Sequence, residues 1–238
     1  MEEITINDIK IDLVRKNIKN IHLAVYPPNG RVRLAAPLAT NDDTIRLFVI
    51  SKLGWIKRNQ RKIEGQERTP PREFKQRESH YFLGKRYLLN IIESNSTPKV
   101  VLRSKTFIDL YVKSNTSTEK RNKIMTEWYR LQLKTQITPM IVKWENIIGV
   151  TVQDWQVKQM KTKWGACNID RGRIWLNLEL AKKPEECLEY IVVHEMVHLL
   201  ERNHNERFDF LMSKYLPNWK QLRGELNKLP VSHTNWNY

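Results

Sequence analysis

The sequence predicts an α+β fold, in which a β-rich first part precedes a helical second part. Up to residue 115, short runs alternate apolar with polar residues, which is the period-2 pattern of half-buried strands. Beyond that point, apolar residues recur at helical spacing over longer segments. We therefore expect two domains, a basic β-rich module over residues 1–115 and a second domain over residues 116–238.

The length and composition exclude several classes of protein. The 238 residues suffice for one large domain or two small ones, and 40% of them are hydrophobic. No apolar run approaches the roughly 20 residues of a membrane span, and the acidic start Met1–Thr5 lacks the order of a signal peptide. The only cysteines are Cys167 and Cys187, which excludes a disulfide scaffold and favours a reducing, cytoplasmic location.

The net charge of +15 lies mainly in the first half of the chain. Residues 1–120 hold 23 Lys and Arg against 13 Asp and Glu, whereas residues 121–238 hold 18 against 13. The basic excess of residues 57–77 comes with few aromatic residues to stack on bases. A nucleic acid, a nucleotide or an acidic protein would be attracted to such a surface, and a solubilising role explains it equally well. The candidate docking residues for a phosphate or nucleic acid are Lys57, Arg58, Arg61 and Lys62.

The first domain is expected to begin with a β-meander of four strands over residues 3–36, followed by a helix. Pro27–Gly30 supplies a turn between the third and fourth strands. Asn41–Asp43 is a helix start, and apolar residues follow it at helical spacing over Ile45–Ile56. The expected strands are Ile4–Ile6, Ile9–Leu13, Ile21–Val25 and Val32–Ala36. No internal repeat is visible in the sequence.

A loop or linker over residues 64–79 precedes a second group of strands. It lacks apolar periodicity and contains two consecutive prolines, Pro70 and Pro71. A hairpin over Tyr81–Leu89 follows, with Gly84-Lys85 as its turn. Two more strands are expected at Lys99–Leu102 and Phe107–Val112.

The second domain is expected to open with a long helix over Glu119–Ile148. Pro139 should kink this helix, and Gly149 suits its end. Further along, Pro184 marks the first turn of an apolar helix, which Asn203 breaks. The remaining strands and helices are expected at Thr151–Met160, Arg173–Leu178, Phe208–Tyr215 and Trp219–Leu229, with residues 161–172 as a connection.

The apolar helix carries the run His194-Glu195-Met196-Val197-His198. Residues four apart share one face of a helix, so His194 and His198 point the same way. Two neutral imidazoles in that position bind Zn²⁺ at about 2.0–2.1 Å each. The neighbouring Glu195 suits the role of a general base.

A third histidine, His204, follows ten residues after His194, the spacing of the metzincin signature H-E-x-x-H-x-x-G-x-x-H. Glu201 occupies the glycine position of that signature, so we expect the chain to turn instead at Asn203, in a left-handed conformation. Three protein ligands without a fourth leave a position for water, which favours a catalytic over a structural site. The structural alternative is two surface histidines and a helix-capping His204.

Three residues are candidates for substrate contact. Tyr190 lies one turn before His194 and either stabilises an oxyanion or packs against the helix. In the run Lys163–Asn168, Gly165 follows Trp164 and lets the backbone approach a substrate or the metal helix closely. The alternative for that run is a β-turn with Trp164 in the core.

With these runs in view, the chain resembles the YgjP-like metallopeptidase family, relatives of the SprT-like and WLM zinc peptidases, over nearly its whole length. The family's R-W-G-S-C, I-x-L-N, V-V-H-E-hydrophobic-x-H-L and N-H-S-x-x-F-W runs correspond to Lys163–Cys167, Ile174–Asn177, Val192–Leu199 and Asn203–Asp209. The departures at positions 163, 166, 205 and 209 remove none of the three histidines.

The resemblance implies a minimal zincin-like metallopeptidase domain with an HExxH active-site helix over residues 116–238. It also implies that His194, His198 and His204 bind one Zn²⁺ per chain and that Glu195 is catalytic. A peptide or protein is the implied substrate.

Other functions compete with a zinc-dependent peptidase. The basic first half favours a metal-dependent nucleotide phosphohydrolase, such as a nucleoside triphosphate pyrophosphatase, but three imidazoles suit Zn²⁺ better than the Mg²⁺ of phosphate chemistry. A nucleic-acid-associated protease would use residues 57–77 for docking. A plain nucleic-acid binder leaves Glu195 without a role.

Overall fold

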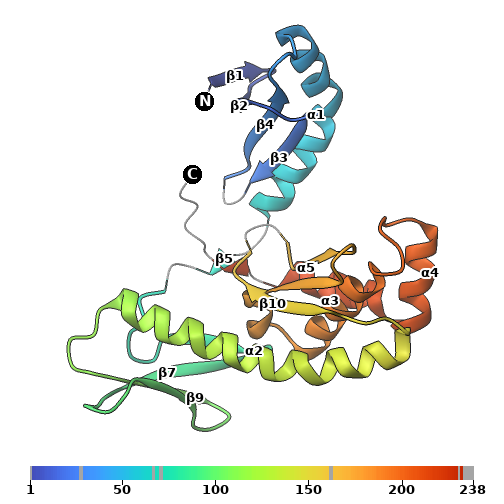
Figure 1. Ribbon diagram of the computed structural model, residues 1–238. Coiled ribbons are helices and arrows are strands. Elements are labelled where there is room, and N and C mark those ends of the chain that lie inside the picture. Colours follow the sequence, from blue (N-terminus) through green and yellow to red (C-terminus); the bar gives the residue numbers. More distant parts are fainter. Residues whose placement is uncertain are drawn as a thin grey trace. The chain divides into compact units, whose positions relative to one another are not determined.

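The computed structural model describes residues 2–26, 29–65, 68–69, 72–160, 163–229 and 231–232 (Figure 1). Contacts divide the chain into two compact units, Met1–Thr69 and Pro70–Tyr238, each with its own hydrophobic core. The mixed helix and strand content confirms the expected α+β class. The division differs from the boundary expected between residues 115 and 116, because the strands over residues 79–112 bury their apolar side chains in one core with the later helices.

The first unit is a four-stranded sheet covered by one helix. Its elements are β1 (Glu2–Ile6), β2 (Ile9–Lys16), β3 (His22–Tyr26), β4 (Arg31–Pro37), α1 (Asp42–Glu64) and β5 (Arg68–Thr69). The sheet order is β1-β2-β4-β3, and alternate residues such as Leu34 on β4 pack against Val49 and other apolar residues of α1. Asn41 caps α1 by accepting a hydrogen bond from the Thr44 N–H at 2.8 Å. All four predicted strands and the helix are confirmed, but the expected β-meander is wrong, because β4 pairs parallel with β2 and leaves β3 at the edge. Pro27 and Pro28 of the predicted turn lie outside the described residues.

The second unit also begins with four strands and a helix. These are β6 (Ser79–Phe82), β7 (Lys85–Glu93), β8 (Lys99–Leu102), β9 (Phe107–Val112) and α2 (Thr118–Ile148). The β6–β7 turn lies at Leu83 and Gly84, one residue earlier than expected, with φ of 47° and 75°. A two-residue hairpin turn with positive φ at both positions explains the shift, because glycine best tolerates the second position. The helix α2 runs without interruption through Pro139 to Ile148, and Gly149, the residue expected at its end, is the left-handed C-cap.

The two units share one topology. Each unit contains two consecutive antiparallel hairpins, and the fourth strand of the four pairs parallel with the second. The resulting sheet orders are β1-β2-β4-β3 and β6-β7-β9-β8. A capped helix then packs on the sheet. Both first turns have two positive φ angles, at residues 7–8 and 83–84. The structure thus contains a repeat that is invisible in the sequence, because the alternating burial is repeated while the apolar side chains differ: Val32, Leu34 and Ala36 in β4 against Ile108, Leu110 and Val112 in β9.

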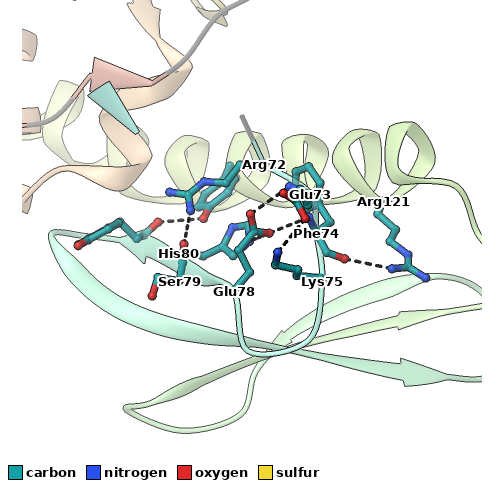
Figure 2. A network of polar contacts seen from close by, with 10 residues as sticks. Arg72, Glu73, Phe74, Lys75, Glu78, Ser79, His80 and Arg121 are labelled. Atoms are coloured by element: carbon teal, nitrogen blue, oxygen red, sulfur yellow. Dashed lines mark hydrogen bonds and ion pairs between the residues drawn. The ribbon is translucent and has the colours of Figure 1, made fainter. Parts of the chain in front are cut away.

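A network of polar contacts closes the segment that leads into β6 (Figure 2). The Glu78 carboxylate accepts hydrogen bonds from the N–H groups of Glu73 and Phe74, at 3.0 and 2.7 Å, and contacts His80 Nε2 at 3.1 Å. Arg121 of α2 donates to the Phe74 carbonyl at 3.0 Å, and Arg72 donates to the Ser79 carbonyl at 2.5 Å. The buried His80 is therefore enclosed by a segment that carries both negatively and positively charged side chains.

The rest of the second unit is a small sheet with three helices. Its elements are β10 (Asp154–Lys158), β11 (Gly165–Asn168), β12 (Arg173–Asn177), the 3-10 helix η1 (Leu178–Lys182), α3 (Glu185–Val197), α4 (Glu206–Tyr215), α5 (Trp219–Lys228) and β13 (Val231–Ser232). The sheet order is β10-β12-β11, so the unpredicted strand β11 forms an edge within what was expected to be a connection. The core of the unit lies between α2, α3 and the two sheets.

Candidate metal centre

The helix α3 is largely buried and packs against α2, α4, α5 and the strands β11 and β12. Pro184, expected in its first turn, is its N-cap residue, and the helix ends at Val197 rather than at the break expected at Asn203. His198 keeps helical dihedral angles as the C-cap residue, and its N–H bonds to the His194 carbonyl at 3.3 Å. The two histidines therefore share a face, as their spacing predicted.

The three histidines of the sequence analysis converge. Ring nitrogens of His194, His198 and His204 all lie within 4.8 Å of one another, and His194 Nε2 is 3.0 Å from His204 Nε2. The Phe208 ring of α4 packs against all three imidazoles, with centroid distances of 5.0, 4.7 and 4.7 Å. Among the described residues this is the only cluster of three groups that suits a metal ion.

The turn that brings His204 back differs from the expectation. Asn203 does not have a positive φ, so it is not left-handed. The chain instead leaves α3 at Val197 and reverses gradually, with the Asn203 N–H bonded to Glu201 Oε1 at 3.1 Å and the Asn205 N–H bonded to the Asn203 carbonyl at 2.9 Å. Asn205 then caps α4. A longer turn that ends in a helix cap thus replaces the single glycine of the metzincin signature.

Two of the three histidines, His194 and His198, are held as neutral nitrogen donors. His198 Nδ1 lies 3.0 Å from the Glu201 carbonyl, and since a carbonyl oxygen only accepts, Nδ1 carries the proton and Nε2 has the free lone pair. Burial, reinforced by the other two histidines and by Arg223, lowers the pKa of His194 to about 3. Burial also lowers the pKa of His198. Neutral imidazoles whose nitrogens face one point fit the donor set of a zinc ion.

Glu195 points away from solvent. Its side chain is 4% exposed, and burial raises its pKa to about 8, while the positive charge of Lys163 opposes that rise. The nearest strand is β11, where a Cβ added to Gly165 would lie 2.7 Å from Glu195 Cγ and 2.8 Å from Cδ. The close backbone approach predicted for Gly165 is therefore an approach to the helix that carries the histidines.

Trp164 and Tyr190 are the other two candidate residues for substrate contact. Trp164 is half-buried beside the core, and the Lys183 ammonium lies 5.6 Å from its ring. It directly precedes the strand β11 rather than lying in the β-turn of the alternative interpretation. The Tyr190 ring is buried and meets His194 edge-on at 5.8 Å. Burial raises the pKa of Tyr190, which the nearby Arg223 opposes. A role of Trp164, Gly165 or Tyr190 in substrate contact stays a prediction.

The basic candidate residues belong to the first unit. Lys57, Arg58 and Arg61 are exposed on α1, whereas the side chain of Lys62 lies outside the described residues. Docking of a phosphate or nucleic acid there stays a prediction.

Two residues near the centre were not singled out by the sequence analysis. Asn177 is buried at the end of β12 and hydrogen-bonds the backbone that leads into β11. Arg223 of α5 acts on both His194 and Tyr190 through its charge. The I-x-L-N run pointed to Asn177 only as part of a pattern, and no local signal marked Arg223.

An HExxH helix with a third convergent histidine, set in an α+β unit, defines the class of the metallopeptidases. A protein-family model described as YgjP-like, metallopeptidase domain, matches residues 19–229. The chain belongs to the YgjP-like metallopeptidase family.

Comparison with solved structures finds a likeness to the crystal structure of the metallopeptidase zymogen of Pyrococcus abyssi abylysin. The identity is 20% and the TM-score 0.35, over 39% of this chain and 97% of that chain. A search of curated proteins gives no significant match. In the part of the chain that the structure describes, no helix combines the length and apolar character of a membrane span.

Proposed function

We propose that the protein is a zinc-dependent peptidase in which His194, His198 and His204 hold one zinc ion and Glu195 is the general base. The observation that carries the proposal is the convergence of three imidazoles at the end of a buried helix. The next residue after the first of these histidines is the buried Glu195.

The donor set favours zinc and a peptide over magnesium and a phosphate. The cluster found among the described residues contains three imidazoles and no carboxylate. Imidazole suits Zn²⁺, whereas Mg²⁺ at phosphate sites is bound through carboxylates and water. A nucleotide phosphohydrolase would need acidic ligands that the described part of the cluster does not supply.

The residues of the chain divide the chemistry among them. When bound, a zinc ion would act as a Lewis acid that polarises the scissile carbonyl and lowers the pKa of water. Glu195 takes a proton from the attacking water and gives a proton to the leaving amine. A carboxyl group whose pKa lies near neutrality suits both transfers, and burial supplies that elevation here.

Metal content and one substitution test the assignment. Purified protein that has never met a chelator should contain about one zinc per chain by elemental analysis. Glu195→Gln should keep the zinc and lose peptide hydrolysis by at least about 100-fold. Glu186→Gln, an exposed position on the same helix, is the matched control and should keep full activity. Protein without zinc would refute the metal assignment.

The choice of substrate is tested separately. Wild type and Glu195→Gln are incubated in parallel with a peptide library and with nucleoside triphosphates. We expect turnover of peptides by wild type only. Turnover of the triphosphates alone would refute the peptidase and favour the phosphohydrolase.

A further inference from the structure

At Gly165, the first residue of the edge strand β11, the backbone passes close to the Glu195 side chain. A Cβ on residue 165 would meet three atoms of that side chain at less than 3 Å, which are Cγ at 2.7 Å, Cδ at 2.8 Å and, closer still, Oε1. Rotation of the carboxylate alone would not relieve these contacts, because Cγ and Cδ lie on the axis of that rotation and stay in place. A side chain at position 165 would therefore force Glu195 into another rotamer.

The backbone conformation of Gly165 does not itself require glycine. The four glycines with positive φ are Gly30, Gly84, Gly149 and Gly172. Gly165 lies within a regular strand and pairs with Leu176 of β12. Since an L-residue can adopt this backbone, what the glycine provides at this position is space for the Glu195 side chain.

The strand cannot retreat from Glu195, because Asn177 holds the residues before it. The Asn177 amide donates to the Met160 carbonyl at 2.9 Å and to the Lys163 carbonyl at 2.7 Å. Its backbone N–H donates to the Trp164 carbonyl at 2.9 Å. The side-chain oxygen accepts from the Glu179 N–H at 3.1 Å. One buried asparagine thus fixes the entry to β11 against the end of β12.

We propose that Gly165 is a positioning residue that sets the orientation of the Glu195 carboxylate, with β11 held in place by Asn177. The inference rests on the proposed function, in which Glu195 is the general base. Gly165 contributes no atom to the chemistry. Its missing side chain leaves a slot between β11 and α3, and the Glu195 side chain fills that slot in one orientation.

The test combines Gly165→Ala with removal of the side chain that it would strike. Turnover of a peptide cleaved by wild type, zinc content and Tm are measured for wild type, Gly165→Ala, Glu195→Ala and the double variant. Gly165→Ala should keep about one zinc, and its kcat should fall roughly 100-fold with little change in KM. Its Tm should also fall. In the Glu195→Ala background the same substitution should leave both Tm and residual turnover unchanged, because the crowded atoms are gone.

Gly224→Ala is the matched control for a glycine-to-alanine change. Gly224 lies on α5, and a Cβ there meets nothing within 4 Å. This variant should hydrolyse the peptide at the wild-type rate.

The outcomes separate the positioning role from a general structural one. Wild-type kcat in zinc-loaded Gly165→Ala overturns the proposal, and so does an equal loss of Tm in both backgrounds. If Gly165→Ala does not fold, a folded double variant supports the contact, and a double variant that also fails to fold overturns it. Wild-type turnover by Glu195→Gln refutes the proposed function by itself. If turnover depends on Glu195 but is unchanged by Gly165→Ala, only the positioning role is refuted.

Discussion

His198 shows how a backbone carbonyl prepares an imidazole for a metal. The Glu201 carbonyl fixes the proton on Nδ1, which leaves the lone pair of Nε2 free for a metal ion. The buried Nδ1 of His194 has no such partner among the described residues. The orientation of His194 therefore rests on packing, chiefly against the rings of Tyr190 and Phe208.

His80 makes stability depend on pH. Burial, with help from the charges of Arg72 and Lys182, lowers its pKa from 6.5 to about 4, although Glu78 acts in the opposite direction. The unfolded chain thus binds a proton more readily than the folded chain between these values. We expect the contribution of His80 to the free energy of unfolding to be constant above pH 6.5. Toward pH 4 that contribution should fall by up to about 1.4 kcal/mol per pH unit.

Chemical denaturation of wild type and His80→Gln between pH 4 and pH 8 measures this effect. The variant should be less stable near pH 7, where the buried neutral imidazole contributes its packing, but it should lose less stability on acidification. Parallel curves for the two proteins would contradict the assignment.

At the scale of residues, the sequence predicted what depends on spacing along one helix. The face shared by His194 and His198, the third histidine and the neighbouring Glu195 all follow from short-range pattern. The contact between Gly165 and Glu195 joins a strand to a helix far along the chain. A single sequence shows that a glycine is present but not which side chain occupies the space that it leaves.

At the scale of elements, the β6–β7 hairpin supports the start of α3, the helix that carries His194. The N–H groups of Leu83 and Gly84 donate to the carbonyls of Ala181 and Lys182 in η1, at 3.0 and 3.3 Å. A Cβ on Gly84 would lie 2.9 Å from Pro184 Cγ, at the N-cap of α3. The turn of the hairpin therefore abuts the start of the helix whose other end carries the histidines.

Gly84→Ala should lower the stability of the second unit more than the backbone penalty alone. A left-handed alanine costs about 1–2 kcal/mol, and the contact with Pro184 adds to that loss. Gly149→Ala is the matched control, because Gly149 has nearly the same φ, 76°, and its added Cβ meets nothing within 4 Å. Chemical denaturation compares the two variants. Equal losses would show that the hairpin turn does not press on Pro184.

The periodic elements were predictable, and the exceptions have physical causes. The strands of both four-stranded sheets and the helices α1 and α2 follow from apolar spacing and caps such as Asn41. The strand β11 was missed because it is four residues long and half-buried throughout, so no alternation marks it. The end of α3 at Val197 was also missed, because the apolar pattern continues through Leu199 and Leu200 beyond the last helical residue.

At the scale of the whole molecule, two separate cores predict two unfolding transitions. Asn41→Ala removes the cap of α1 and should destabilise only the first unit, by about 1 kcal/mol. Ser117→Ala removes the cap of α2 and should affect only the second unit. Removal of the proposed zinc ion by a chelator should lower only the second transition, because a ligand stabilises the unit that binds it. Scanning calorimetry of the full chain measures all three. A single transition that every change shifts alike would contradict independent units.

The repeated topology has a consequence for how the chain reaches its native pairing. Parallel partners are Ile11 and Val32 in β2 and β4, and Leu89 and Ile108 in β7 and β9, and all four side chains are apolar and buried. An exchanged pairing would keep apolar side chains on the correct face, and burial alone would reject it only weakly. Synthesis from the N-terminus distinguishes the copies by time, because hairpins form in microseconds while residues are added at about 5–20 per second. Refolding of the complete chain removes that order and makes all strands of both copies available to one another at once.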